Sequence, residues 1–219
     1  MNSYILPGLK LLTQKVATQA LHDCAESSES DPVRCHPDTH VAIIANLEEW
    51  AAGSTYNYSI WRVGGSAGVG KTTILHMTAE NLESRNLLLT SFFFWRTREC
   101  CNCGKFFIAT LAYQIAISIP ETWQYIEHAV EEDPLTFSKK LEVQSQILIV
   151  NPITSVYQQH ALPLNHPWIF IIDSLDECLD TNLQLLDCPK SGPGPPGPRS
   201  GPDRTPKVRV QVQMQRTWT

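Results

Sequence analysis

Residues 65–72 read Gly-Ser-Ala-Gly-Val-Gly-Lys-Thr and match the pattern G-x-x-x-x-G-K-[ST], which is typical of loops that bind the phosphates of a nucleotide. Glycines at 65, 68 and 70 allow successive backbone N–H groups to point inward at phosphate oxygens. A helix that starts directly after the loop would add the positive end of its dipole. In a loop of this type the Lys71 ammonium contacts the β- and γ-phosphates, and the Thr72 hydroxyl binds Mg²⁺.

The predicted phosphate contacts cover the whole loop and the first turn of the helix. They are Gly65, Ser66, Ala67, Gly68, Val69, Gly70, Lys71, Thr72 and Thr73. Thr73 also fits a residue that packs the helix against its neighbours. The alternative is a glycine-rich turn between a strand and a helix in which the lysine has no ligand.

A second group of chemically capable residues, Asp173, Asp176 and Glu177, follows the wholly apolar run 168–172. Carboxylates at the carboxyl end of a buried parallel strand project into the crevice where α/β sheets bind ligands. Asp173 is the candidate for holding Mg²⁺, which prefers octahedral oxygen ligation and keeps several waters. Glu177 or Asp176 would orient or deprotonate the attacking water. Acids that cap a helix or face solvent are the alternative interpretation.

Strands and helices alternate around these two motifs. A strand at 58–63 precedes the loop and a helix at 72–85 follows it. Residues 87–95 form a near-continuous apolar run, as expected of a strand buried on both faces of a parallel sheet. Together with the strand at 168–172, this alternation predicts an α/β architecture.

Apolar spacing predicts five further helices, at 9–20, 38–50, 106–119, 121–132 and 138–150. We expect Asp38 or Thr39 to cap the second of these helices at its N-terminus. The last one should end before Pro152, because proline lacks the N–H group that a helix interior needs.

Four segments in combination resemble one known family. They are residues 65–73, 91–94, 107–114 and 171–178, and the small Ser174 after Asp173, with acids two and three residues later, completes the likeness. Together they resemble the NACHT NTPase domain of fungal STAND proteins of the nephrocystin-like N-terminal type. Residues 36–39 and the helix through Trp50 resemble the segment upstream of the family's phosphate loop, so the resemblance covers about residues 35–180.

The resemblance implies a three-layer α/β core of the P-loop NTPase type with a mostly parallel sheet. It implies ATP or GTP as ligand together with Mg²⁺, and a role as a nucleotide-dependent signalling switch that forms homo- or hetero-oligomers with other NACHT or STAND proteins. Family members continue after the acidic strand into further strands, a winged-helix region and a repeat array. This chain departs from that pattern after residue 188.

Residues 189–219 contain 11 Pro or Gly residues, a composition that cannot bury enough apolar surface to offset its ordering entropy. Three parts are expected: an N-terminal helix and linker at 1–34, a partial NTPase domain at 35–188 and a disordered basic tail at 189–219. Val208, Val210 and Val212 alternate with polar residues and could form one edge strand, although we expect no stable one. The sheet would then be incomplete beyond the acidic strand, as in a truncated family member.

Net charge and composition limit the kinds of partner and cellular location that we expect for the chain. The net charge of −5 divides unevenly, because residues 189–219 hold six Lys or Arg and one Asp, whereas the preceding residues carry −10. An acidic body argues against a broad nucleic-acid-binding face. No apolar run approaches 18 residues and no secretory signal is apparent at the N-terminus, so we expect no membrane span and an intracellular, cytoplasmic location.

Seven cysteines, an odd number without an export signal, favour reduced thiols. The cluster Cys100, Cys101 and Cys103 suggests zinc, but no second spaced pair follows it. A polar loop in which thiols happen to gather is the simpler interpretation.

Three functions remain open from the sequence. The first is a purine nucleoside triphosphate-binding signalling module in which binding is better supported than turnover. The second is a non-catalytic interaction fragment or decoy that associates with full-length STAND proteins. The third is a small-molecule or nucleic-acid kinase, which would show arginines in a lid beyond the acidic strand.

Overall fold

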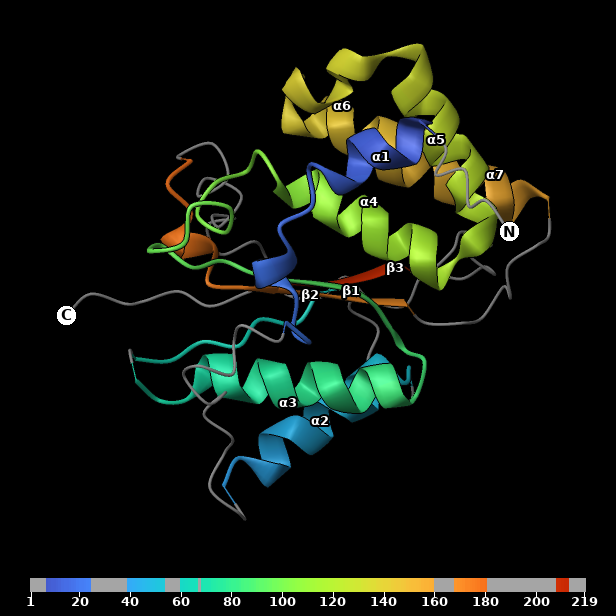
Figure 1. Cartoon of the computed structure of the whole chain (residues 1–219). Helices are drawn as coiled ribbons and strands as arrows, with labels where there is room; N and C mark the ends of the chain where they lie inside the picture. The colour runs from blue at the N-terminus through green and yellow to red at the C-terminus, as the bar shows by residue number, and fades with distance from the viewer. Residues whose placement is uncertain are drawn as a thin grey trace, which may run out of the picture.

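The computed structural model describes residues 7–24, 39–53, 60–66, 68–159, 168–180 and 208–212. These residues form three layers, with a small sheet in the middle and helices on both of its faces (Figure 1). The chain is therefore an α/β protein, as its alternating sequence pattern predicts.

The sheet contains three parallel strands in the order β1-β2-β3. Strand β1 spans Leu88–Phe93, β2 spans Trp168–Asp173 and β3 spans Val208–Val212. Phe93 aligns with Asp173 in the β1·β2 ladder, so both strands end at the same edge of the sheet. Every residue of β2 is buried, which accounts for its wholly apolar composition up to the terminal aspartate.

Two helices cover the lower face of the sheet in Figure 1: α2, Val41–Ala51, and α3, Lys71–Ser84. Their buried side chains meet those of β1 and β2 in one apolar cluster that includes Leu47, Trp50 and Leu75. This packing fixes α3 beneath β1 and β2, so the N-terminus of α3 faces the edge where both strands end.

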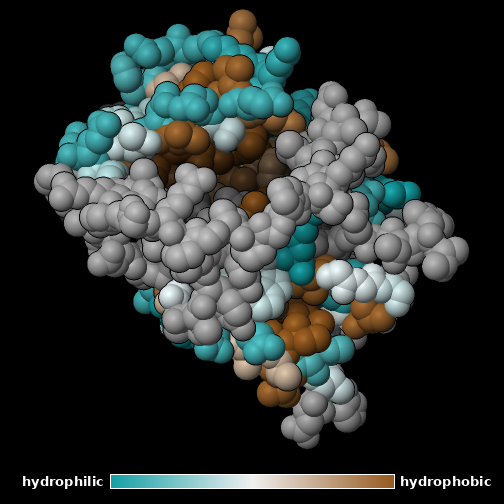
Figure 2. Space-filling view, turned by 180° about the vertical axis from the view of Figure 1, so that it is seen from behind, coloured by the Kyte–Doolittle hydropathy of each residue, from teal (hydrophilic) through white to brown (hydrophobic). Residues whose placement is uncertain are grey.

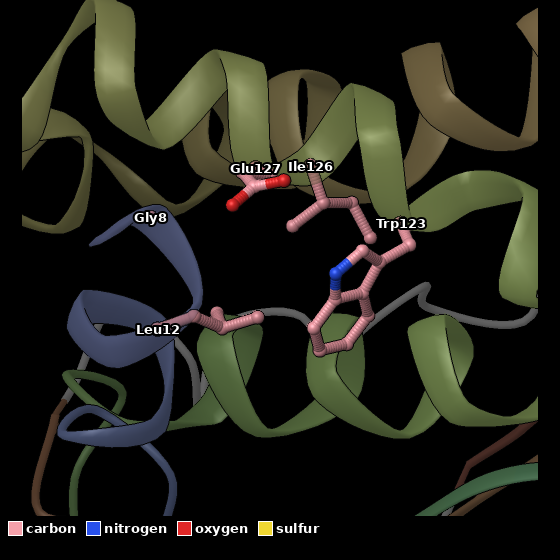
Figure 3. Close-up of a pocket in the computed structure, with 5 residues that line it drawn as sticks. All are labelled: Gly8, Leu12, Trp123, Ile126 and Glu127. Atoms are coloured by element: carbon pink, nitrogen blue, oxygen red, sulfur yellow. The ribbon is translucent and has the colours of Figure 1, made fainter. Parts of the chain in front are cut away.

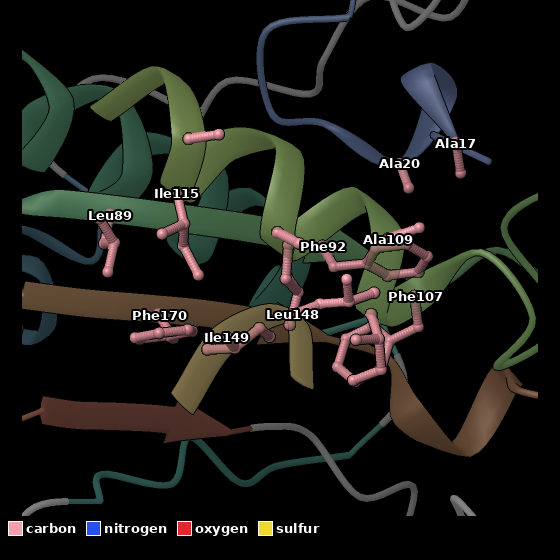
Figure 4. Close-up of a cluster of buried hydrophobic side chains, with 14 of the residues drawn as sticks. Ala17, Ala20, Leu89, Phe92, Phe107, Ala109, Ile115, Leu148, Ile149 and Phe170 are labelled. Atoms are coloured by element: carbon pink, nitrogen blue, oxygen red, sulfur yellow. The ribbon is translucent and has the colours of Figure 1, made fainter. Parts of the chain in front are cut away.

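The upper face of the sheet carries α1, α4, α5, α6 and α7 (Figure 1). They span Pro7–Thr13, Phe107–Ser118, Trp123–Glu132, Leu141–Ser145 and Asn151–Gln158. Helix α4 lies directly on the sheet, where Ile115 and Phe107 contact Phe92 and its neighbours in the main apolar core (Figure 4). Short 3-10 helices stand at Thr18–Ala20 (η1), Pro120–Thr122 (η3), Pro134–Ser138 (η4) and Leu175–Glu177 (η6), and the π-helical segment η5 at Gln146–Val150.

Helix α1 reaches this upper layer by a close approach to α5. A Cβ on Gly8 would lie only 2.8 Å from the carbonyl oxygen of Glu127, so any other residue there would push the helices apart. Figure 3 shows Leu12 of α1 and Trp123 and Ile126 of α5 lining the small hollow between the two helices. None of the described helices has the length and apolar character needed to cross a bilayer.

The strongest apolar runs are predicted correctly, but the strand before the phosphate loop is not. Residues 60–63 have no regular structure, and 58–59 lie outside the described residues. The second neighbour of β2 is instead β3, which pairs in parallel from Trp168↔Val208 to Ile172↔Val212. A fully buried strand needs hydrogen-bonding partners along both sides, and the β-branched alternation at 208–212 suits that place.

The prediction that the sheet stops after the acidic strand, with a wholly disordered tail, is thus wrong for residues 208–212. Residues 189–207 and 213–219, like the linker at 25–32, lie outside the described residues.

The helical stretch around Pro152 also differs from the prediction. Instead of ending before Pro152, it runs through η5 directly into α7, in which Pro152 stands in the first turn. A proline ring collides with the carbonyl four residues earlier in a regular helix, and a π turn widens the backbone at that point. The chain therefore continues in the same direction without a break.

Two predicted helix boundaries near the N-terminus are wrong. Helix α1 ends at Thr13, and the chain reaches Ala20 through η1 rather than as one helix. The N-cap of α2 is His40, with φ 61° in the left-handed region and no side-chain cap bond, rather than Thr39; Asp38 lies outside the described residues.

A pair of histidines ties the segment after η1 to the sheet and to α3. The His22 ring lies 2.9 Å from the Ser91 hydroxyl through Nδ1 and 3.2 Å from a Glu83 carboxylate oxygen through Nε2. His76 of α3 stacks on Phe93 with ring centroids 3.9 Å apart. Burial, with a smaller contribution from the nearby His22, lowers the pKa of His76 to about 4. Although His22, Ser91 and Glu83 are connected like a catalytic triad, Ser91 is fully buried, so the chain of contacts is structural.

We predict that His76 makes folding stability depend on pH. The unfolded chain binds a proton at His76 below about pH 6.5, whereas the folded chain resists protonation until its pKa near 4. The free energy of unfolding should therefore fall by about 1–3 kcal/mol from this group as pH drops from 7 to 4. Urea unfolding at several pH values, compared between the wild type and His76→Phe, measures the loss.

The matched control for this experiment is His128→Gln, which removes an exposed histidine paired with Glu132. An equal pH slope in the wild type and His76→Phe would contradict the assignment to His76.

Candidate phosphate-binding site

The glycine-rich loop leads into α3, whose first residue is Lys71. The Lys71 ammonium donates hydrogen bonds of 2.9 Å to the carbonyl oxygens of both Gly65 and Ser66, and the side chain is buried. The first N–H groups of an α-helix have no partners within the helix and can bind an anion. The loop thus curves around the Lys71 ammonium at the N-terminus of α3. A phosphate that bound Lys71 would have to displace the two carbonyl oxygens.

Positive backbone angles explain two of the glycines. Gly68 and Gly70 both have φ 81°, a conformation that side chains with a Cβ rarely adopt. A Cβ on Gly70 would also lie 3.3 Å from Nε2 of His40, so the imidazole of His40 stands against the loop. His40 itself has a positive φ, which turns the chain before α2 and brings its ring to this place.

Asp173 ends β2 on the same side of the sheet. It is 1% exposed, and neither carboxylate oxygen has a hydrogen-bonding partner of good geometry among the described residues. Burial raises the pKa of Asp173 to about 6, and the hydroxyls of Thr72 and Ser174 lie close enough to offset part of the rise. A buried carboxylate without good partners is costly unless a cation neutralises it.

These observations fit a magnesium site. The side chain of Thr72, in the first turn of α3, meets Asp173 from the neighbouring strand, so a hydroxyl faces a buried carboxylate that has no hydrogen bond of good geometry. Thr72 and Asp173 would hold Mg²⁺, with waters and phosphate oxygens as its other ligands. The ion would supply positive charge that neutralises phosphate oxygens.

The two acids after Ser174 contact the loop that follows β1. A Glu177 carboxylate oxygen accepts a hydrogen bond of 3.0 Å from the backbone N–H of Arg96. The Arg96 guanidinium donates to the carbonyl oxygen of Asp176 at 3.1 Å. Glu177 is near enough to Asp173 to raise its pKa, so this acid belongs to the same site. Its engagement with Arg96 holds the acidic turn in place.

The structure thus brings the sequence-derived candidates Lys71, Thr72, Asp173 and Glu177 to one edge of the sheet. Val69 is exposed, Thr73 is half-buried, and Asp176 is held through its carbonyl oxygen. Ala67 lies outside the described residues.

Sequence reasoning missed His40 and Arg96. The reasoning that predicted Asp173 also applies to Arg96, because Arg96 likewise follows the carboxyl end of a buried parallel strand. His40 carries no such signal, since its position depends on a left-handed turn and on packing between α2 and α3.

The cysteines do not form a metal centre in the described part of the chain. No group of three or more His, Cys, Asp or Glu side chains there is arranged to hold a metal ion. The five described cysteines, at 24, 100, 101, 103 and 178, form no disulfide.

The fold and the site define an α/β protein with a glycine-rich loop at the start of a helix and a buried acid at the end of a parallel strand. A model of the family described as nephrocystin 3, N-terminal, matches residues 44–191, more than half of the chain. The chain therefore belongs to the nephrocystin 3 N-terminal family. No curated protein and no solved structure matched it.

Gly70→Ala should destabilise the protein, because alanine at φ 81° is strained and its Cβ would press on His40. We expect a loss of roughly 1–2 kcal/mol in the free energy of unfolding, measured by urea denaturation. Gly64→Ala is the control, since a Cβ on Gly64 meets nothing within 4 Å. Similar losses in the two variants would contradict the role of the Gly70 conformation.

Asp173→Asn should stabilise the protein at pH 7 when nucleotide and Mg²⁺ are absent. The change removes a buried charge whose oxygens lack good partners, and we expect a gain of about 1–3 kcal/mol. Denaturation with and without Mg²⁺ measures this gain. Asp133→Asn, an exposed acid paired with Lys139, should give no gain. A less stable Asp173→Asn protein would refute the idea that Asp173 is uncompensated.

Proposed function

We propose that the chain is a NACHT-type signalling module that binds a purine nucleoside triphosphate, ATP or GTP, with Mg²⁺. The observation that carries this proposal is the meeting of Thr72, at the start of α3, with the buried and poorly partnered carboxylate of Asp173. An uncharged ligand would leave that carboxylate uncompensated, whereas a magnesium–phosphate group would neutralise it.

Lys71 gives the site its affinity for phosphate. In the structure its ammonium is bound to two carbonyl oxygens, which are neutral acceptors. Phosphate oxygens carry charge and form stronger hydrogen bonds to an ammonium, so a triphosphate would displace the carbonyls. The N–H groups of the loop and of the first turn of α3 would bind the remaining oxygens.

Hydrolysis in this proposal is slow. An acid that activates water must reach it with a free carboxylate oxygen. Glu177 uses one oxygen on the Arg96 backbone, which restrains the side chain. We therefore propose a protein in which binding dominates and turnover is weak.

Association with other NACHT or STAND proteins is the second part of the proposal. Helix α2 exposes Val41 by 60% and Ile43 by 43%, and Ile60 is 51% exposed. Figure 2 shows apolar surface in the lower part of the molecule, the end where α2 lies in Figure 1. The same surface supports the alternative, a non-catalytic fragment that binds full-length relatives, which would retain association without nucleotide.

Titration of the full chain with fluorescent ATP and GTP analogues tests the nucleotide proposal. Lys71→Ala should weaken binding at least about tenfold, because it removes a charge-assisted contact to phosphate. Asp173→Ala should abolish the difference between titrations with and without Mg²⁺. Lys10→Ala, an exposed lysine at the last turn of α1, is the control and should bind as the wild type does.

Undiminished binding by Lys71→Ala would overturn the site assignment. Absence of nucleotide binding by the wild type, with retained association to a second copy, would favour the interaction fragment.

A further inference from the structure

Two loops at the carboxyl edge of the sheet meet around a pair of cysteines. One loop follows β1 and contains Cys103; the other follows β2 and contains Cys178. The N–H of Leu179 donates to the carbonyl oxygen of Asn102 at 2.6 Å, so the residues adjoining the two cysteines are hydrogen-bonded to each other. Figure 1 shows η6 and the loop after β1 side by side at this edge.

The same contact places Cys178 beside Gly104, the residue that follows Cys103. Burial raises the pKa of the Cys178 thiol, and hydrogen bonds from the backbone N–H groups of Asp180 and Gly104 offset part of the rise. The Cys103 sulfur lies 4.0 Å from the carbonyl oxygen of Glu99, within its own loop. A disulfide needs Cα atoms about 4.4–6.8 Å apart, a separation that residues flanking one hydrogen bond between loops can reach. Cys103 is partly exposed and Cys178 is fully buried, so solvent reaches one partner of the pair.

We propose that Cys103 and Cys178 are a peroxide-sensitive modification site that forms a reversible disulfide between the two loops. Cys103, the accessible thiol, reacts first, and Cys178 resolves the product.

The chemistry needs one molecule of a peroxide. The Cys103 thiol gives up its proton, and the thiolate attacks a peroxide oxygen so that the O–O bond breaks. With hydrogen peroxide the products are a sulfenic acid and hydroxide, which takes up the proton released by the thiol and becomes one water. The Cys178 sulfur then attacks the sulfenic sulfur, the S–S bond forms and hydroxide leaves, taking the thiol proton to become a second water. Two thiols are oxidised by two electrons and the peroxide is reduced. A thiol reductant reverses the link.

The other described cysteines fit this role less well. Cys101 is fully buried, and burial raises the pKa of its thiol to about 11, so it carries little reactive thiolate. Cys100 is exposed but directly adjoins Cys101 in the chain. Cys24 is also half-buried, but it lies in the segment after η1. Cys103 is the partly exposed thiol that adjoins the hydrogen bond between the two loops.

A disulfide between Cys103 and Cys178 would restrain the turn that contains Asp176 and Glu177. Arg96 holds Asp176 and Glu177 through two hydrogen bonds, which can open and close. A disulfide five residues beyond Asp173 would hold the two loops together until it is reduced, and would oppose the release of Glu177 from Arg96. This consequence rests on the proposed function: oxidation should lower phosphate release several-fold and leave nucleotide affinity unchanged.

Peptide mapping of the full chain tests the disulfide itself. The Cys188→Ser protein is treated with hydrogen peroxide, alkylated and digested with trypsin, which leaves Cys178 as the lone cysteine of peptide 141–190. We expect this peptide to be linked to peptide 99–105 and released by a thiol reductant. The link should be lost in Cys103→Ser and retained in the control Cys100→Ser.

Two results would overturn the proposal. One is the absence of the linked peptide under conditions that oxidise Cys103 to a trappable sulfenic acid; the other is a link that persists in Cys103→Ser. Neither result depends on nucleotide. A chain that forms the disulfide but binds no nucleotide would refute the proposed function and leave this inference standing.

Discussion

A buried carboxylate at the end of an apolar strand is the constraint on which the rest of the site depends. Asp173 closes a strand with no exposed residue, and its two oxygens have no partner of good geometry in the described structure. Such a group is unfavourable in an apolar core, and it is tolerated when a cation or donors can reach it. Two elements surround it: α3 begins beside it with Thr72 and Lys71, and Arg96 contacts the turn that follows it. In the proposed function, a bound cation would restore the stability that this buried carboxylate costs.

Local signals account for the parts of the fold that the sequence predicts. The runs at 87–95 and 168–172 become β1 and β2 because a strand buried on both faces is predominantly apolar. The loop and α3 are predicted because glycines, a lysine and an amphipathic stretch follow one another within twenty residues. Asp173 is placed correctly for the same reason, since a single acid ends an otherwise apolar run.

The remaining features depend on contacts between distant segments. Residues 60–63 have strand-like composition, yet they adopt no regular secondary structure, whereas β2 pairs with β3 from beyond residue 207. Which segment pairs with a given strand depends on residues far apart in the sequence, so the composition of a short stretch does not determine it. His40 reaches the loop only through its left-handed backbone and the packing of α2 on α3, and Arg96 reaches Glu177 only because β1 and β2 end in register. Both residues therefore emerge from tertiary structure.

Lys71 and Glu177 explain why binding and turnover separate in the proposed function. Each uses its charged group on backbone atoms, Lys71 on two carbonyls and Glu177 on one N–H. Lys71 would form stronger hydrogen bonds if phosphate oxygens replaced the two carbonyls, because charged phosphate is a stronger acceptor than a neutral carbonyl. Glu177 would form no stronger hydrogen bond with a water molecule than with the Arg96 N–H, so the bond to Arg96 opposes the release of its carboxylate. In this proposal a bound triphosphate pairs with Lys71 but does not release Glu177 from Arg96. Glu177 can activate water only after the loop that follows β1 is freed.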